Sequence, residues 1–178
     1  MDIECKFLPM TTGVSVTDDF RITGYASRFG ASDQGGDTVA KGAYAASLAT
    51  GRKVMMLWQH DPSQPIGIWE EIREDDAGLW VKGHLLEGVE KAREAAALIR
   101  AGAIDGLSIG YRTVRAEKAA GGGRLLTELE LWEVSLVTFP MLPSARVSAK
   151  GDSPDDPLRD VAAALNAARQ EMAGQAPR

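Results

Sequence analysis

The sequence predicts a mostly β fold with a few peripheral helices, in the α+β class. Short apolar or alternating runs that are typical of strands recur through residues 20–137. Glycine-rich or acidic stretches separate several of these runs at the spacing of hairpin loops. Only three stretches show the apolar period of a helix. Many strands with few helices indicate a barrel-like sheet with helices on its outside.

The N-terminal part of this domain begins with a strand. Residues 20–26 alternate apolar and polar side chains, which is the period of a half-buried strand. Residues 30–36 are rich in Gly, Ser and Asp and are expected to form a loop. Residues 40–49 favour a short helix, because Tyr44 and Leu48 lie four positions apart in a helix-forming composition.

A buried strand and a hairpin follow. Residues 54–58 form a continuous apolar run of strand length, and the Asp61-Pro62 pair is expected to end that strand region. Residues 66–72 and 78–86 are two further strand candidates, separated by an acidic stretch that ends in glycine. That separation predicts a β-hairpin.

The clearest helix and a second hairpin complete the domain. Residues 89–101 repeat apolar positions at steps of three and four, and Gly102 supplies a C-terminal stop. Residues 106–114 and 125–137 are expected to form two strands joined by the three glycines at 121–123.

The composition changes at Gly151. Residues 151–157 carry three Asp and two Pro, which is typical of a linker, and residues 158–172 are Ala-rich with one apolar stripe. We therefore expect one domain over residues 1–150, followed by a linker and helical C-terminal tail over residues 151–178.

Bulk properties exclude several classes of function. The 178-residue chain has 25 acidic and 20 basic residues, so its net charge of −5 does not favour nucleic-acid binding. The single cysteine, Cys5, excludes an internal disulfide, and no apolar run has the length of a membrane span. No secretory signal is visible, so cytoplasmic synthesis is expected. Two histidines and no cysteine pair leave too few ligands for a metal site.

The first candidate for catalysis is His60, at the end of the buried strand. Histidine is the most frequent general base near neutral pH, and strand ends often carry reactive groups. The alternative is a loop histidine that bonds a backbone carbonyl. The other histidine, His84, falls inside an expected strand and is interpreted as structural or surface.

The second candidate is Ser108, which has glycines two positions before and after it, Gly106 and Gly110. Small neighbours allow a substrate carbonyl to approach closely, and nearby amides can stabilise an oxyanion. The alternative is a packing point or bulge within a strand.

The third candidate is Glu133, which alternates onto the face opposite Trp132 and Val134. An acid among bulky apolar residues needs a partner, and an imidazole would serve. The alternative is a solvated strand face, since Glu128 and Glu130 lie nearby. The chain thus offers a base, a nucleophile and an acid, but their spacing alone does not show that they meet.

Taken in order, four segments resemble the prohead protease family of tailed phages, the type described for HK97-like capsids. The matching segments are GYAS with a following Phe at 24–29, LWQHD with PIG at 57–67, GLSIGY at 106–111 and LWEVSLVTFP at 131–140. The resemblance spans about residues 1–150. Its specificity for this family comes from the four segments taken together in this order.

The resemblance implies an assemblin-like β-barrel ringed by helices, as in the related herpesvirus enzymes, and a serine endopeptidase. It makes Ser108 the nucleophile and His60 the general base. Glu133 occupies the position of the third triad member, with Asp61 and Asp105 as rivals. Four candidates remain for oxyanion stabilisation: the backbone amides of Ile109 and Gly110, and the side chains of Arg112 and Arg146.

The resemblance also implies the biological setting. The expected substrates are the scaffold-like segment of the major capsid protein and the protease itself, cut inside the assembling prohead in the host cytoplasm. A homodimer is expected, with no cofactor, nucleic acid or membrane partner. Two alternatives are a catalytically silent capsid-assembly protein of the same fold and a β-barrel binding module in which Ser108 and His60 only pack.

Overall fold

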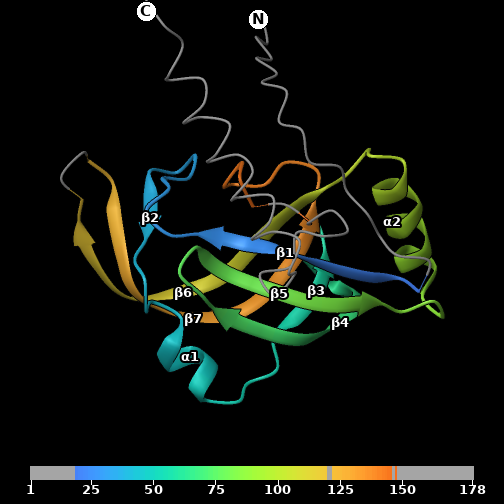
Figure 1. Cartoon of the computed structure of the whole chain (residues 1–178), viewed down its shortest axis with the longest axis horizontal. Helices are drawn as coiled ribbons and strands as arrows, with labels where there is room; N and C mark the ends of the chain where they lie inside the picture. Colours follow the sequence, from blue (N-terminus) through green and yellow to red (C-terminus); the bar gives the residue numbers. More distant parts are fainter. Residues whose placement is uncertain (1–18, 120–121, 146, 148–178) are drawn as a thin grey trace, which may run out of the picture.

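The computed structural model describes residues 19–119, 122–145 and 147, which form one curled seven-stranded sheet and two helices (Figure 1). The strands are β1 (Arg21–Arg28), β2 (Asp37–Val39), β3 (Met55–Trp58), β4 (Asp61–Glu74), β5 (Gly78–Leu85), β6 (Gly106–Lys118) and β7 (Arg124–Val137). The helices are α1 (Ala45–Ala49) and α2 (Glu90–Arg100). The predicted mostly β class is confirmed.

Strand β7 organises the sheet, because it is paired along both of its sides. The strand order is β1-β5-β4-β3-β7-β2, and β6 also pairs with β7. On one side β7 runs parallel to β2 near its start and to β3 near its end. On the other side β6 pairs antiparallel with it over the full length of the hairpin. The predicted pairing of 106–114 with 125–137 is confirmed, and both strands are longer than expected.

The sheet curls until its edges β1 and β6 come close together. Between them lies the segment that follows β7. The Leu107 amide donates to the Ala145 carbonyl and the Val147 amide donates to the Asp105 carbonyl, both at 2.8 Å. Val147 also forms an antiparallel bridge with Gly24 of β1. This segment therefore links the two edges at one end of the sheet.

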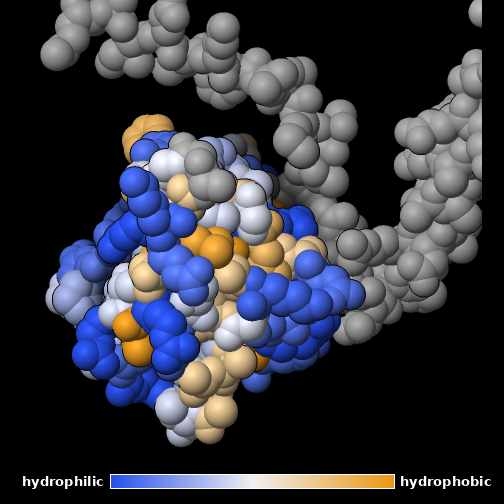
Figure 2. Space-filling model, turned by 90° about the vertical axis from the view of Figure 1, so that its left-hand side faces the viewer, coloured by the Kyte–Doolittle hydropathy of each residue, from blue (hydrophilic) through white to orange (hydrophobic). Residues whose placement is uncertain are grey.

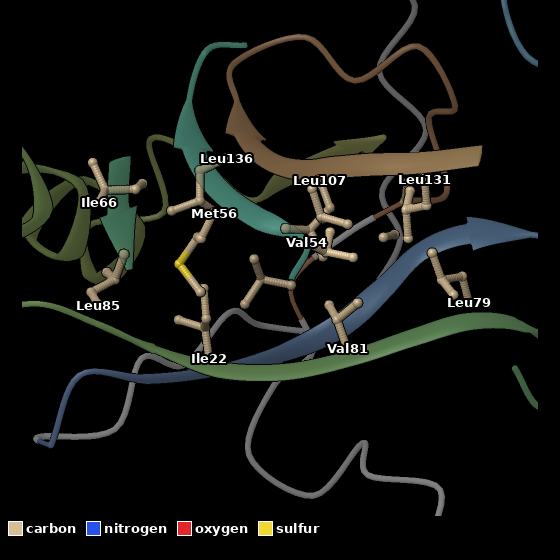
Figure 3. Packing of buried hydrophobic residues seen from close by; sticks show 14 of the residues in the cluster. Ile22, Val54, Met56, Ile66, Leu79, Val81, Leu85, Leu107, Leu131 and Leu136 are labelled. Carbon is tan, nitrogen blue, oxygen red and sulfur yellow. The ribbon is translucent and has the colours of Figure 1, made fainter. Parts of the chain in front are cut away.

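The hydrophobic core fills the space inside the curl. Ile22 of β1 and Val81 of β5 point toward Met56 of β3 and Leu136 of β7, and each is at most 1% exposed (Figure 3). The apolar run at 54–58 contains β3, as predicted, but the strand is not buried on both faces, because Met55 is 40% exposed. Burial of large side chains from five or more strands is what stabilises the curl.

The helices do not ring the sheet, so this part of the expectation is wrong for the described residues. Helix α1 packs near β7 and β4, and α2 packs against β4 and β5 through its buried face of Ala92, Ala95, Ala96 and Ile99. The expected helix at 40–49 is reduced to α1. Gly42 in its first half has a φ of +89°, a left-handed conformation that a right-handed helix does not contain.

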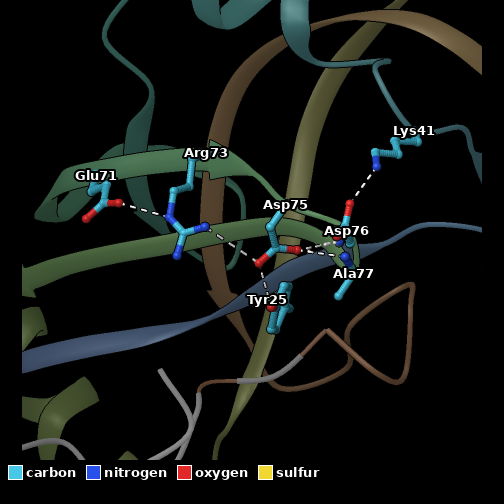
Figure 4. Close-up of polar contacts among 8 residues, drawn as sticks. Tyr25, Lys41, Glu71, Arg73, Asp75, Asp76 and Ala77 are labelled. Atoms are coloured by element: carbon cyan, nitrogen blue, oxygen red, sulfur yellow. Dashed lines mark hydrogen bonds and ion pairs between the residues drawn. The ribbon is translucent and has the colours of Figure 1, made fainter. Parts of the chain in front are cut away.

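The turn between β4 and β5 is held by Asp75. Its carboxylate accepts hydrogen bonds from the Ala77 and Gly78 amides and from the Tyr25 hydroxyl at 2.6 Å (Figure 4). A Cβ at position 78 would lie 2.9 Å from the Ser27 carbonyl carbon, so only glycine fits there. The predicted hairpin is confirmed, and these contacts explain why its turn sequence ends in glycine.

The far ends of β6 and β7 form a projecting arm, along which β2 pairs with the start of β7 (Figure 1). The β6 side chains there are largely exposed, and the arm carries both signs of charge, as in the ion pairs of Arg115 with Glu128 and Arg112 with Glu130. Seen from this end, the surface is mainly hydrophilic, with apolar groups gathered between the charged ones (Figure 2). The expected linker and tail at residues 151–178, and with them the domain boundary, lie outside the described residues.

Candidate active site

His60 lies in a tight turn that returns the chain from β3 into β4. Trp58 pairs with Asp61, so Gln59 and His60 form a two-residue hairpin loop. Their φ values are +53° and +62°, which is the pattern of a type I′ turn. The expectation that Asp61-Pro62 ends the strand region was therefore wrong. The turn precedes these residues, and β4 starts at Asp61 with its prolines beside register shifts, where sheets tolerate them.

The side chain of Gln59 fastens this turn to the residue after β7. Its Nε2 donates to Thr138 Oγ1 at 2.8 Å, and its Oε1 accepts from the Thr138 amide at 3.3 Å. The Gln59 amide donates to the Leu136 carbonyl at 2.9 Å. Non-glycine residues with positive φ are uncommon and cost free energy, so these three hydrogen bonds help to hold an unfavourable conformation. Neither Gln59 nor Thr138 was among the candidate residues predicted from the sequence.

Glu133 lies on β7 between β3 and β6, where its backbone pairs with Met55 and Gly110. Its side chain is only 13% exposed. The carboxylate packs directly over Gly110, where a Cβ would clash with it and would lie 2.7 Å from Glu133 Cγ and Cδ. Gly110 therefore makes room for the acid. The glycines on either side of Ser108 indicated from the sequence that another group approaches the backbone closely here. The expected group was a substrate carbonyl, whereas the structure places the Glu133 carboxylate over Gly110.

His60 and Glu133 meet directly. His60 Nδ1 lies 2.5 Å from Glu133 Oε1, and the Ser135 hydroxyl donates to the other carboxylate oxygen. The hydrogen bond to Glu133 raises the pKa of His60, which burial opposes and the charge of Glu133 reinforces. A proton on Nδ1 shared with the carboxylate leaves Nε2 as the basic nitrogen of the neutral ring. This is the arrangement a general base needs.

Ser108 occupies the neighbouring position on the same face. It lies on β6 directly opposite Ser135, two residues from the Gly110–Glu133 pair, and is 5% exposed. Directly opposed residues share a face, and diagonal neighbours in such a ladder are about 7–8 Å apart. No hydrogen bond joins Ser108 to His60 in the described structure. Bonds between a nucleophile and its base are often formed or tightened only when substrate binds.

The rival acids have other contacts. Asp61 accepts hydrogen bonds from the Ser63 amide at 2.9 Å and hydroxyl at 2.6 Å, which lower the pKa of Asp61. Asp105 receives the Val147 amide on its backbone carbonyl. Among the described residues it is Glu133 that contacts the His60 ring.

The remaining candidates lie elsewhere. His84 bonds Glu70 across β5 and β4 at 2.8 Å, in agreement with its interpretation as a structural or surface residue. The Arg112 guanidinium is bound to Glu130 at 2.6 Å, and Arg146 lies outside the described residues. Within the described ranges, no cluster of His, Cys, Asp and Glu is arranged to hold a metal ion. No helix among those residues has the length and apolar character to cross a bilayer.

The family follows from a comparison with known proteins. Residues 10–157 match the family described as caudovirus prohead serine protease, which is most of the chain. The chain belongs to this family. Its resemblance to prohead proteases, inferred from four ordered segments, is therefore confirmed.

Two relatives are phage proteins whose names refer to the prohead or the capsid. The prohead protease of Enterobacteria phage HK97 is 34% identical over 143 residues, which cover 78% of this chain and 64% of that protein. The capsid polyprotein of Pseudomonas phage PAJU2 is 30% identical over 103 residues, which cover 54% of this chain and 15% of the polyprotein. The chain thus spans less than two thirds of the length of either relative.

Two solved structures align with this prohead protease family member, and the first of them shares its fold. The capsid assembly protease of bacteriophage T4 aligns with a TM-score of 0.56 at 19% identity, covering 66% of this chain and 80% of that one. The varicella-zoster virus protease aligns with a TM-score of 0.48 at 14% identity, covering 82% and 76%. The T4 likeness supports the curled β architecture.

Proposed function

We propose that this chain is a serine endopeptidase of prohead maturation, with Ser108 as nucleophile, His60 as general base and Glu133 as the acid that orients the imidazole. The observation that carries the proposal is the 2.5 Å contact between His60 Nδ1 and Glu133 Oε1 on the face that also holds Ser108. Membership of the prohead serine protease family supports the same assignment.

The chemistry divides into two balanced steps. Ser108 Oγ attacks the scissile carbonyl carbon while its proton passes to His60 Nε2, and Glu133 stabilises the imidazolium that forms. His60 then gives that proton to the leaving nitrogen as the C–N bond breaks, which leaves an ester on Ser108. A water molecule, deprotonated by the same nitrogen, hydrolyses the ester and restores the serine.

The proposed substrates are the scaffold-like segment of the major capsid protein and the protease itself. A relative that is a capsid polyprotein supports a close association between this domain and capsid protein. We place the activity in the host cytoplasm, inside the assembling prohead, and propose a homodimer and no nucleic-acid or membrane partner. Residues 1–150 would form the protease domain, and residues 151–178 a tail that self-cleavage removes.

The experiment is intact mass spectrometry after expression with and without the cognate major capsid protein. Wild type, Ser108→Ala and a control variant of an exposed loop serine, Ser32→Ala, are compared. We expect wild type and Ser32→Ala to lose a C-terminal fragment or to shorten the capsid protein, and Ser108→Ala to leave every mass intact.

Unchanged masses for all three variants, with folded protease and assembled capsid partner present, would refute the protease assignment. The catalytically silent assembly protein would then be the better description. Cleavage that persists in Ser108→Ala would instead show that another residue is the nucleophile.

A further inference from the structure

A bulge in β7 brings Glu133 and Ser135 onto the same face of the sheet. The register with β6 skips Trp132, which is an extra residue of β7 between Leu131 and Glu133. Leu131 before the bulge and Val134 after it are both 0% exposed, so the alternation of faces changes at this point. In a regular strand Glu133 would share the core face with Leu131. Because of the bulge, Glu133 and Ser135 both lie on the face turned away from the core.

Ser135 and His60 together occupy the Glu133 carboxylate. The Ser135 hydroxyl donates to one carboxylate oxygen, and His60 Nδ1 lies 2.5 Å from the other. A carboxylate that is held at both oxygens cannot rotate about its last bond without losing one of these contacts. Ser135 is 0% exposed although it faces away from the core, so its hydroxyl is shielded from water. A hydrogen bond to a charged group in such surroundings is among the stronger ones.

The neighbours of Ser135 place it at the centre of the candidate triad. It lies directly opposite Ser108 on β6 and beside Leu57 on β3, the strand that leads into the His60 turn. Two serines thus face each other across β6 and β7. The proton of the Ser135 hydroxyl is directed to Glu133, so the two serines have different surroundings, and Ser108 is left as the partner for His60 Nε2.

We propose that Ser135 is a positioning residue of this site, which acts through Glu133. Its hydroxyl holds the carboxylate in the one orientation that keeps His60 Nδ1 protonated and points Nε2 toward Ser108. This inference rests on the proposed function and adds a fourth side chain to it. Ser135 does not bind substrate in this arrangement, so its loss should lower kcat and leave KM nearly unchanged.

Three variants separate hydrogen bonding from packing. Ser135→Ala removes the hydroxyl, Ser135→Cys keeps a similar volume with a weak donor, and Ser135→Thr keeps the hydroxyl. The substrate is a synthetic peptide that spans the cleaved junction of the cognate capsid protein, and thermal unfolding identifies the variants that fold. We expect kcat to fall at least about tenfold in Ser135→Ala and Ser135→Cys and to stay close to wild type in Ser135→Thr. A Ser135→Cys protein as fast as wild type would overturn the inference, because packing alone would then suffice.

A double-mutant cycle with Glu133→Gln tests whether Ser135 acts through the acid. We expect Ser135→Ala to lower kcat at least about tenfold in wild type, but at most about twofold in Glu133→Gln, where no charged carboxylate is left to hold. The control is Ser47→Ala, which removes a buried hydroxyl that accepts the Leu131 amide at 2.9 Å on the same strand. Ser47→Ala should have the same effect on kcat in both backgrounds. An equal effect of Ser135→Ala in both backgrounds would contradict the positioning role.

Proton NMR of the free protein gives a readout that needs no substrate. We expect a resonance from the His60 Nδ1 proton in wild type, because its hydrogen bond to Glu133 slows exchange with water. This resonance should be lost in Glu133→Gln, exchange at least about tenfold faster in Ser135→Ala, and persist in Ser47→Ala. The same exchange rate in Ser135→Ala as in wild type would show that the acid does not depend on Ser135.

Failure of this inference and failure of the proposed function give different results. If wild type cuts the peptide, Ser108→Ala does not, and folded Ser135→Ala cuts as fast as wild type, then the role of Ser135 is wrong while the proposed function stands. If folded wild type cuts neither the peptide nor the capsid protein, the proposed function has failed.

Discussion

At the scale of single residues, the contact between His60 and Glu133 determines which ring nitrogen would act as base in the proposed mechanism. Glu133 is 13% exposed and holds Nδ1, so the neutral ring presents Nε2. The hydrogen bond between Ser135 and the second carboxylate oxygen keeps the acid in place. An isosteric amide at position 133 would keep the shape of the side chain and lose its charge.

We predict that Glu133→Gln lowers kcat by about 10³–10⁴-fold, the scale expected when the orienting acid of a triad is lost. The control is Glu128→Gln on the same strand, whose ion pair with Arg115 lies on the projecting arm. Steady-state cleavage of a capsid peptide gives the measurement. Activity of Glu133→Gln within tenfold of wild type would show that Glu133 does not serve His60.

The pH profile of the same pair adds a second readout. Glu133 raises the pKa of His60 above its ordinary value of 6.5, and catalysis needs the neutral ring, so wild-type kcat/KM should fall as pH drops below that raised pKa. In Glu133→Gln this limb moves to lower pH. The stability of the fold depends on pH in the opposite direction. Because the pKa of His60 is raised in the folded state, the stabilisation from its contact with Glu133 is complete below about pH 6.5 and is lost as pH rises through the folded pKa.

Gly110 offers a separate residue-scale prediction. We expect Gly110→Ala to abolish most activity and to lower the free energy of unfolding by about 1–3 kcal/mol, because the new methyl group clashes with the Glu133 carboxylate. Gly88→Ala is the matched control, since a Cβ there meets nothing within 4 Å. Chemical denaturation and cleavage assays on both variants decide the matter, and a fully active Gly110→Ala would contradict the described packing.

At the scale of secondary-structure elements, the β3–β4 turn presents His60 because Gln59 ties it to the end of β7. We predict that Thr138→Val, which removes the hydroxyl acceptor, lowers kcat by at least about tenfold while the melting temperature changes by only a few degrees. Thr138→Ser keeps the hydroxyl and should restore most of the rate. Equal rates for the two variants would argue against a positioning role for this contact.

The elements themselves were largely predictable, because their periods are local properties of the chain. The alternation at 20–26, the apolar run at 54–58 and the helical period at 89–101 correspond to β1, β3 and α2. The start of β4 was not predictable in this way. Pro62 indicated a strand end, whereas a turn with two positive φ values at Gln59 and His60 had already reversed the chain.

The site was predictable only in part, and for a physical reason. His60, Ser108 and Glu133 were predicted as candidates from residue type and from the family resemblance, and the structure brings His60 and Glu133 into contact. The contacts of Gln59 with Thr138, 79 positions apart, depend on the register between β3 and β7. A shift of one residue in that register would turn Glu133 to the other face of the sheet, and no local pattern in the sequence specifies it.

At the scale of the whole molecule, the strand order assembles the candidate triad. β7 carries the acid at the centre, and its two neighbours supply the other members: the turn after β3 carries the base, and β6 carries the nucleophile. The curl of the sheet buries its core on one side and leaves this constellation on the other. Any change that opens the curl should therefore reduce activity together with stability.

Acid should destabilise the whole fold. The hydrogen bond from Arg124 lowers the pKa of Asp37, and side-chain hydrogen bonds likewise lower the pKa values of Glu70 and Glu130. Burial would raise the pKa of Asp75, but the hydrogen bonds it accepts bring it below its ordinary value. A carboxylate whose pKa is lowered by folding stabilises the folded state at any pH above its pKa in the unfolded chain, which is about 4. This stabilisation is lost as pH falls through the lower pKa of the folded state.

We therefore predict that the urea midpoint of unfolding is nearly constant from about pH 6 to about pH 5 and declines steeply below about pH 4. Circular dichroism at a series of pH values gives the midpoints. A midpoint that stays constant down to about pH 3 would mean that these carboxylates are not stabilised by folding.

The central claim is that Ser108 is a nucleophile activated by His60, and covalent labelling tests it most directly. The folded protein is treated with a fluorophosphonate near pH 8, and the modified residue is located by peptide mass analysis in wild type and in His60→Ala. The account predicts one label, on Ser108, formed at least about 100-fold more slowly without His60. Absence of the label from folded wild-type protein, or labelling at another serine, would contradict it.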